Sequence, residues 1–358
     1  MAGLASELSS HYYNMNEEII FIISSLSDSH CKHRILSFLQ LGYRVKVYGF
    51  QRNGESVPEN LPYEITVVGT VQDSQYRARI RTYLKGISRI VRQEGNKKLY
   101  FTFGLDLTLF LRIVSPRCKY IYEEADLVHT YMKSWRKRVL ERIDKGLIRR
   151  SQYTILTSEG FAQYHFGTNY PKNIQIVPNK LNADVLKIPF SKSPFDIHHL
   201  RFAFVGGARF DTIDFFVQTL LENFPQHEFH FYGTVEPRME RFKEQFSNVF
   251  YHGRFKNPDD LSSIYENIDL VLSTYDTRFD NVKYAEPNKL YEAIYFHTPI
   301  IVSNDTFLAQ KVQKLGVGFV VNPFDSSAII QFVQSITGQQ LIQKQNACQM
   351  IPKTDCIN

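Results

Sequence analysis

The chain has 358 residues, enough for about two domains, and its 28 Phe and 21 Tyr supply side chains for two hydrophobic cores. It contains no apolar run near the ~20 residues of a membrane-spanning helix, and residues 1–18 lack the basic start and apolar core of a secretion signal. Its four cysteines show neither metal-ligand spacing nor a disulfide framework, which predicts a reducing, cytoplasmic location.

Charge is divided unevenly along the chain. Residues 1–196 carry 28 Lys and Arg against 18 Asp and Glu, a net charge of +10. Residues 197–358 carry 14 against 18, a net charge of −4. This asymmetry predicts that the two halves contact different partners.

The first half alternates short apolar runs with helical patterns. Strands are expected at Glu18–Ser24, Arg44–Gly49, Glu64–Val68, Lys98–Phe103, Tyr120–Glu123, Tyr153–Thr157 and Ile174–Val177. Helices are expected before Gly42 and near 74–93, 105–113 and 132–150. The loop at 25–29 has no glycine, so the fingerprint of a nicotinamide dehydrogenase is absent.

A polar segment with two prolines, Ile188–His199, separates this series from a second one. Further strands are expected at Arg201–Val205, Glu228–Tyr232, Val249–His252, Leu270–Ser273, Pro299–Val302 and Phe319–Val321. The pattern predicts an α/β protein with two Rossmann-like, doubly wound domains facing a cleft. We expect domains at 1–190 and 200–335, with a tail at 336–358 that packs back towards the first domain.

Two strand ends in the second half have ligand-binding features. The first is followed by Gly206 and Gly207, which let the backbone approach a ligand closely, and by Arg209, which can form paired hydrogen bonds to phosphate. The next strand ends at Tyr232 and Gly233. The alternative interpretation is an ordinary glycine turn beside a solvated arginine.

The stretch Pro287-Asn288-Lys289-Leu290 is typical of a helix start, with proline in the first helical position. We expect the amides of Asn288, Lys289 and Leu290 to lack partners and to favour a phosphate. The Lys289 side chain would add a full positive charge beside this phosphate. Glu292 can accept hydrogen bonds from two neighbouring ribose hydroxyls. Alternatively, this helix packs in a Rossmann-like core and binds nothing.

The helix start, followed by Pro299-Ile300-Ile301, resembles the sugar-nucleotide motif of retaining glycosyltransferases with the GT-B fold, family 4 or group 1. More narrowly, it is similar to the bacterial capsule and exopolysaccharide members. The resemblance implies that Arg209 contacts the donor diphosphate and that Tyr232 and Gly233 lie near the base.

One position departs from the family pattern. The family has two glutamates with seven residues between them; Glu292 matches the second, whereas Tyr284 occupies the first position. Whether Glu286 replaces the missing glutamate in contacting the donor sugar stays open.

In the first half, the family has an acidic segment at the position of the acids that end and follow the strand expected at Tyr120–Glu123. The resemblance implies that His129 or Asp126 contacts the donor sugar. The alternative is that His129 is a structural histidine, which is the commoner role for a lone histidine after a strand.

Basic residues gather in two amphipathic stretches, 77–92 and 133–150, with Trp135 in the second. Such helices can lie on an anionic membrane surface, although a solvated helix face would look the same. No nucleic-acid-binding motif accompanies the charge, so a nucleic-acid partner is not expected.

These observations predict a cytoplasmic glycosyltransferase, peripheral on the inner face of the cell membrane. The resemblance to the family implies that it retains the anomeric configuration and needs no metal. Its donor would be a nucleotide-diphosphate sugar of the UDP or GDP type, with no other cofactor. Its acceptor would be a saccharide, lipid-linked, in bacterial surface polysaccharide synthesis. The alternatives are a non-catalytic partner of the same fold, favoured by Tyr284, or a sugar-nucleotide epimerase. The base, sugar, linkage and oligomeric state stay open.

Overall fold

The computed structural model describes residues 18–52, 54–72 and 76–358. Residues 1–17 of the segment that was compared with a secretion signal therefore lie outside the described residues. The expected helix start at residue 74 also lies outside them. The chain divides into two compact units between Val177 and Pro178. Across the described ranges, no helix combines the length and the apolar character needed to cross a membrane.

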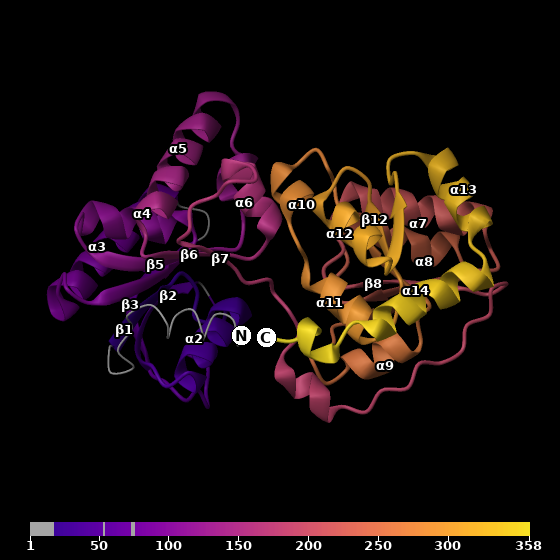
Figure 1. Cartoon of the computed structure of the whole chain (residues 1–358), viewed down its shortest axis with the longest axis horizontal. Helices are drawn as coiled ribbons and strands as arrows, with labels where there is room; N and C mark the ends of the chain where they lie inside the picture. The colour runs from indigo at the N-terminus through magenta and orange to yellow at the C-terminus, as the bar shows by residue number, and fades with distance from the viewer. Residues whose placement is uncertain (1–17, 53, 73–75) are drawn as a thin grey trace. The chain divides into compact units, whose positions relative to one another are not determined.

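The first unit is built on a parallel sheet with helices on both faces (Figure 1). The strands of its described residues are β1 (Glu18–Ile23), β2 (Arg44–Arg52), β3 (Ile65–Val71), β4 (Leu99–Phe103), β5 (Lys119–Glu124), β6 (Tyr153–Leu156) and β7 (Ile174–Ile176). They run in the order β3-β2-β1-β4-β5-β6-β7. The helices are α2 (Ser29–Gln40), α3 (Tyr76–Glu94), α4 (Leu105–Val114), η1 (Val128–Tyr131), α5 (Ser134–Arg150) and α6 (Glu159–Phe166).

The second unit repeats this architecture with the strand order β10-β9-β8-β11-β12-β13. Its strands are β8 (Arg201–Val205), β9 (Glu228–Tyr232), β10 (Val249–Gly253), β11 (Leu270–Ser273), β12 (Ile300–Ser303) and β13 (Gly318–Val321). Its helices are η2 (Ala183–Lys187), α7 (Asp211–Asn223), η3 (Pro237–Arg241), α8 (Phe242–Gln245), α9 (Leu261–Glu266), α10 (Asp280–Tyr284), α11 (Asn288–Tyr295), α12 (Phe307–Leu315), α13 (Ser326–Ser335), α14 (Gly338–Met350) and η4 (Lys353–Cys356).

Successive residues of a strand face opposite sides of the sheet, and helices cover both sides, which explains why the central strands β1, β4, β8, β11 and β12 are mostly apolar and buried. In β8, Ala203 and Val205 pack with α9, α11 and α12, whereas Phe202 and Phe204 pack with α7, α8 and α13. All strand pairs in both sheets are parallel. The predicted α/β class with two doubly wound sheets is confirmed.

The division at Val177 places residues 178–190, predicted in the first domain, with the second unit. Val185 of η2 is fully buried in the second core, and the Leu181 amide donates to the carbonyl of Cys356 at 2.9 Å. Cys348 of α14 packs in the same core, so the predicted tail contributes to the second unit. Its expected packing towards the first domain stays a prediction. Local sequence did not indicate this pairing because the paired segments lie far apart in the chain.

Candidate functional site

The loops that follow β8 and β9 run side by side in the second unit. The Gly206 amide donates to the Tyr232 carbonyl at 2.7 Å, and the Ala208 amide donates to the Thr234 carbonyl at 2.8 Å. A Cβ atom on Gly233 would lie 2.2 Å from the carbonyl oxygen of Gly206. Both glycines have positive φ, 126° for Gly206 and 118° for Gly233, which L side chains rarely adopt. Glycine is therefore required by the close backbone contact.

The sheet order reverses its direction between β8 and β11, and α/β sheets bind ligands at the carboxyl ends of strands beside such a reversal. Gly206 and Gly207 follow β8 at this point, and Tyr275 follows β11. The Tyr275 amide donates to Ser303 Oγ at 2.8 Å, and the Tyr275 ring contacts that of Phe210. The glycine loop therefore lies at the position that the fold favours for a ligand.

Lys289 reaches this glycine loop from α11. Its side chain is 8% exposed, and its Nζ lies 4.5 Å from the centre of the Phe204 ring. The same Nζ would lie 3.2 Å from a Cβ atom on Gly206. Among the described residues, no carboxylate or other acceptor bonds to the Lys289 ammonium. A buried ammonium that no acceptor hydrogen-bonds, beside the side-chain-free backbone of Gly206, favours an anionic ligand.

Helix α11 begins one residue later than predicted, because Pro287 is the N-cap (φ −76°, ψ 151°) and not the first helical residue. The Leu290 amide donates to the Pro287 carbonyl at 3.1 Å, so the expectation that this amide lacks a partner is wrong. The Leu290 side chain is fully buried in the second core. The amides of Asn288 and Lys289 precede the first intrahelical hydrogen bonds and remain the ones suited to a phosphate.

Glu292 lies one turn into α11 and is 3% exposed. Its Oε2 accepts from the Tyr265 hydroxyl at 2.8 Å, and its Oε1 accepts from Asn288 Nδ2 at 3.1 Å. Burial raises the pKa of the Glu292 carboxyl, while the Lys289 charge and the Tyr265 hydroxyl oppose the rise. A carboxylate has about four acceptor positions, so capacity for ribose hydroxyls remains after these two bonds.

Glu286 has a partner that the sequence did not indicate. Its carboxylate accepts from Lys311 Nζ at 2.5 Å and also from the Tyr291 hydroxyl. Lys311 belongs to α12, and its Nζ lies 3.2 Å from the Tyr291 hydroxyl. The charge on Glu286 is therefore compensated within the protein.

Arg209 is exposed just after the glycine loop, and its side chain has no ion pair within the described ranges. Its carbonyl accepts from Arg238 Nη2 at 2.8 Å, and Arg238 also pairs with Asp211. Arg278, which sequence reasoning missed, pairs with Asp211 at 3.3 Å and with the buried Asp276. These neighbouring arginines are neutralised by aspartates, which leaves the Arg209 guanidinium as the uncompensated cation of this loop.

Tyr232 is half-buried, and burial raises the pKa of its hydroxyl. Its ring stacks on the ring of His252 with centroids 4.1 Å apart and planes inclined by 6°. His252 in turn contacts His230, with His230 Nδ1 and His252 Nε2 separated by 3.0 Å. Tyr232 therefore belongs to a stacked aromatic set on β9 and the edge strand β10.

The two candidate residues of the first unit differ in exposure. Asp126 is exposed two residues after β5, and its carbonyl accepts from the Val128 amide at 2.9 Å. His129, on η1, is fully buried, and its Nδ1 lies 3.2 Å from Asp144 Oδ2. In this conformation only Asp126 is accessible to a substrate.

Residues 199–338 match the family described as glycosyl transferases group 1. No curated protein matches significantly by sequence. Among solved structures, HepE from Anabaena in complex with UDP and glucose is similar, with 13% identity over 96% of each chain and a TM-score of 0.68. Sucrose-phosphate synthase from Thermosynechococcus elongatus has 15% identity over 93% of this chain and 94% of its own, with a TM-score of 0.66.

A third similar structure is WaaG, a glycosyltransferase involved in lipopolysaccharide biosynthesis, with 16% identity over 94% of this chain and 97% of its own and a TM-score of 0.64. At these identities the likeness establishes the GT-B fold. The glycine loop at 206–209 and the α11 helix start both lie within the segment that matches the group 1 family.

Proposed function

We propose that this chain, whose residues 199–338 form a group 1 glycosyl transferase domain, transfers a sugar from a nucleotide-diphosphate sugar to a saccharide hydroxyl. One observation carries the proposal: the buried, unpaired Lys289 ammonium lies against the open backbone of Gly206 at the start of α11. A diphosphate supplies the anion that this arrangement lacks. A nucleotide diphosphate is also the leaving group of the proposed donor.

The donor diphosphate would lie between the α11 start and the glycine loop. The amides of Asn288 and Lys289 would donate to it, with Lys289 Nζ and the Arg209 guanidinium supplying two full positive charges. Glu292 would orient the ribose, since its two protein donors leave acceptor capacity free. Stabilisation of the leaving group by fixed charges and amides needs no metal ion.

In the proposed reaction, the bond between the anomeric carbon and the diphosphate oxygen breaks. The acceptor hydroxyl forms a new bond to the same face of that carbon, which retains the anomeric configuration. Its proton passes to an oxygen of the departing diphosphate, so no protein nucleophile is required. Asp126, exposed after β5, is the first-unit residue that we propose to contact the sugar.

Glu286 is the candidate to replace the glutamate that is absent at Tyr284. Its ion pair with Lys311 favours a carboxylate held in a fixed position, which suits hydrogen bonding to a sugar hydroxyl. The same pair also suits a purely structural role for Glu286. If Glu286 is structural, no glutamate takes the place that Tyr284 occupies, which favours one alternative, a protein that binds the nucleotide without turnover.

UDP is the donor nucleotide to test first, because the similar HepE structures contain UDP and UDP-glucose, and GDP is the second. Thermal unfolding would be measured without added metal in the presence of UDP, GDP, ADP, CMP or dTDP. A ligand that binds only the folded protein raises its stability. We expect one diphosphate to raise the midpoint, and no response to any nucleotide would contradict the proposal.

Three variants locate the binding site. Arg209→Ala and Lys289→Met should each weaken nucleotide binding roughly 10- to 100-fold, the effect expected for a lost charge-assisted hydrogen bond. Lys314→Met is the matched control, since Lys314 is exposed on α12 and its replacement should leave binding unchanged.

Release of free nucleotide with sugar transfer to an acceptor distinguishes the transferase from a non-catalytic binder. Mass-neutral conversion of the donor would indicate an epimerase.

For the acceptor, we propose a lipid-linked saccharide of bacterial surface polysaccharide synthesis, reached from the inner face of an anionic membrane. Trp135 is 64% exposed and Tyr131 51% exposed, next to the exposed cations Lys133, Arg136 and Arg138. Interfacial aromatics among cations suit an anionic bilayer surface. Flotation with anionic vesicles at low salt should exceed flotation with neutral vesicles or at high salt. Equal, negligible flotation in all conditions would refute the membrane contact.

A further inference from the structure

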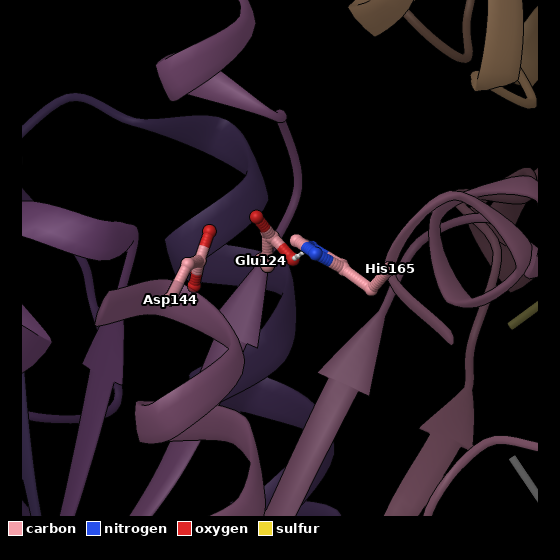
Figure 2. Close-up of side chains that lie close together, drawn as sticks. All are labelled: Glu124, Asp144 and His165. Carbon is pink, nitrogen blue, oxygen red and sulfur yellow. Dashed lines mark hydrogen bonds and ion pairs between the residues drawn. The ribbon is translucent and has the colours of Figure 1, made fainter. Parts of the chain in front are cut away.

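Four titratable side chains from different elements meet inside the first unit. Glu124 ends β5, Asp144 lies on α5, His165 on α6 and His129 on η1. Their exposed fractions are 1%, 0%, 4% and 0%, respectively. Figure 2 shows the Asp144 and Glu124 carboxylates and the His165 ring converging from a helix, a strand end and a third segment. One donor atom from each of these three residues lies within 4.8 Å of the others.

The contacts inside this cluster leave several polar atoms without partners. His165 Nε2 lies 2.9 Å from Glu124 Oε2, and the Tyr122 hydroxyl donates to Asp144 Oδ1 at 2.9 Å. His129 Nδ1 lies 3.2 Å from Asp144 Oδ2, so these two atoms pair with each other and the His129 ring points into the cluster. Glu124 Oε1, His165 Nδ1 and His129 Nε2 form no hydrogen bond within the described ranges. Buried polar atoms are rarely left unsatisfied, so this concentration favours a missing ligand.

The preceding residue provides a contrast. Glu123 is equally buried, but Arg34 binds its carboxylate through two hydrogen bonds of 2.8 Å. In the described part of the chain, no lysine or arginine pairs with Glu124 or Asp144. The cluster thus has two carboxylates but no counterpart of Arg34, which supplies the positive charge beside Glu123.

We propose that Glu124, Asp144 and His165 bind a Zn²⁺ ion, and that a rotation of the His129 ring, which now pairs with Asp144, supplies the fourth ligand. Zinc takes carboxylate oxygens and imidazole nitrogens at about 2.0–2.2 Å in a tetrahedral arrangement, and one ion would cancel the charge of the two carboxylates. Small side-chain movements would bring donor atoms that now lie within 4.8 Å onto a shared ion. The Tyr122 hydroxyl would orient Asp144, as partners beyond the ligands commonly do in metal sites.

This ion would be structural. It would join η1, α5 and α6 to the carboxyl end of β5 and would be enclosed by four ligands that leave no position for substrate. It is distinct from the metal-independent donor site proposed for the second unit, and the inference does not rest on the transferase activity.

The metal content of the full-length protein tests the proposal. After dialysis against a weak chelator, elemental analysis should find about one zinc per chain, as expected for a closed site. Adding Zn²⁺ to metal-stripped protein at about 100 times its dissociation constant should raise the unfolding midpoint by roughly 5–10 °C. Both effects should be lost in Asp144→Asn and in His165→Gln.

His252→Gln is the matched control, because His230 and His252 form another close imidazole pair and could bind zinc adventitiously. This control should keep the zinc and the stabilisation. Zinc retained in both cluster variants, or wild-type protein with no bound zinc and no stabilisation, would overturn the proposal. If the variants fail to fold, Co²⁺ added to metal-stripped wild-type protein should give the visible absorption of tetrahedral coordination, and its absence would equally overturn the site.

Discussion

Replacing Gly233 by alanine tests the close contact between the two loops of the candidate site. The added Cβ would lie 2.2 Å from the Gly206 carbonyl oxygen and 2.8 Å from its carbon, distances at which the backbone must move. The φ of 118° adds strain of about 1–3 kcal/mol for a residue other than glycine. Overpacking against backbone costs about 1–3 kcal/mol more, so we expect a total near 2–6 kcal/mol.

The measurement is thermal unfolding, followed by titration with the nucleotide that stabilises the wild type. A loss of about 2–6 kcal/mol lowers the midpoint by roughly 4–24 °C in a unit of this size, and the displaced Gly206 should also weaken nucleotide binding. Gly207→Ala is the control for stability, because its Cβ would lie 3.4 Å from Thr234 Oγ1 and its φ is not positive. A Gly233→Ala protein that matches this control in stability and the wild type in nucleotide binding would refute the reasoning.

Two further predictions concern buried charges. Arg34→Met leaves the Glu123 carboxylate without its main partner and should cost about 3–5 kcal/mol of unfolding free energy at neutral pH. Burial opposes ionisation of Glu123, but Arg34 and His30 lower its pKa to about 2, so wild-type stability falls as pH decreases from about 4.5 to 2, and this fall should shrink in Arg34→Met. Burial lowers the pKa of Lys192 from 10.5 to about 7, so the unfolded chain binds more protons between these values and stability rises with pH there. Lys192→Met should flatten that rise in denaturant titrations; an unchanged slope would contradict the assignment.

The sequence by itself determined the class of fold and pointed to the region of the proposed donor site. Alternating apolar runs and helical patterns depend on neighbours within a few residues, so β8, β9, β11 and α11 were predicted close to their observed bounds. The glycines at 206 and 233 were also recognisable, because positive φ and close backbone approach select for glycine.

Only the tertiary structure decided which charges are compensated. Glu286 is paired with Lys311, 25 residues further along, whereas Lys289 lies unpaired against Gly206. His129, predicted to touch a sugar, is enclosed with Asp144 in the first unit. These pairings join side chains from separate helices and strands, and no local pattern encodes a partner that folding brings near. The local sequence therefore specified the elements, and packing between distant elements specified the chemistry that each side chain has available.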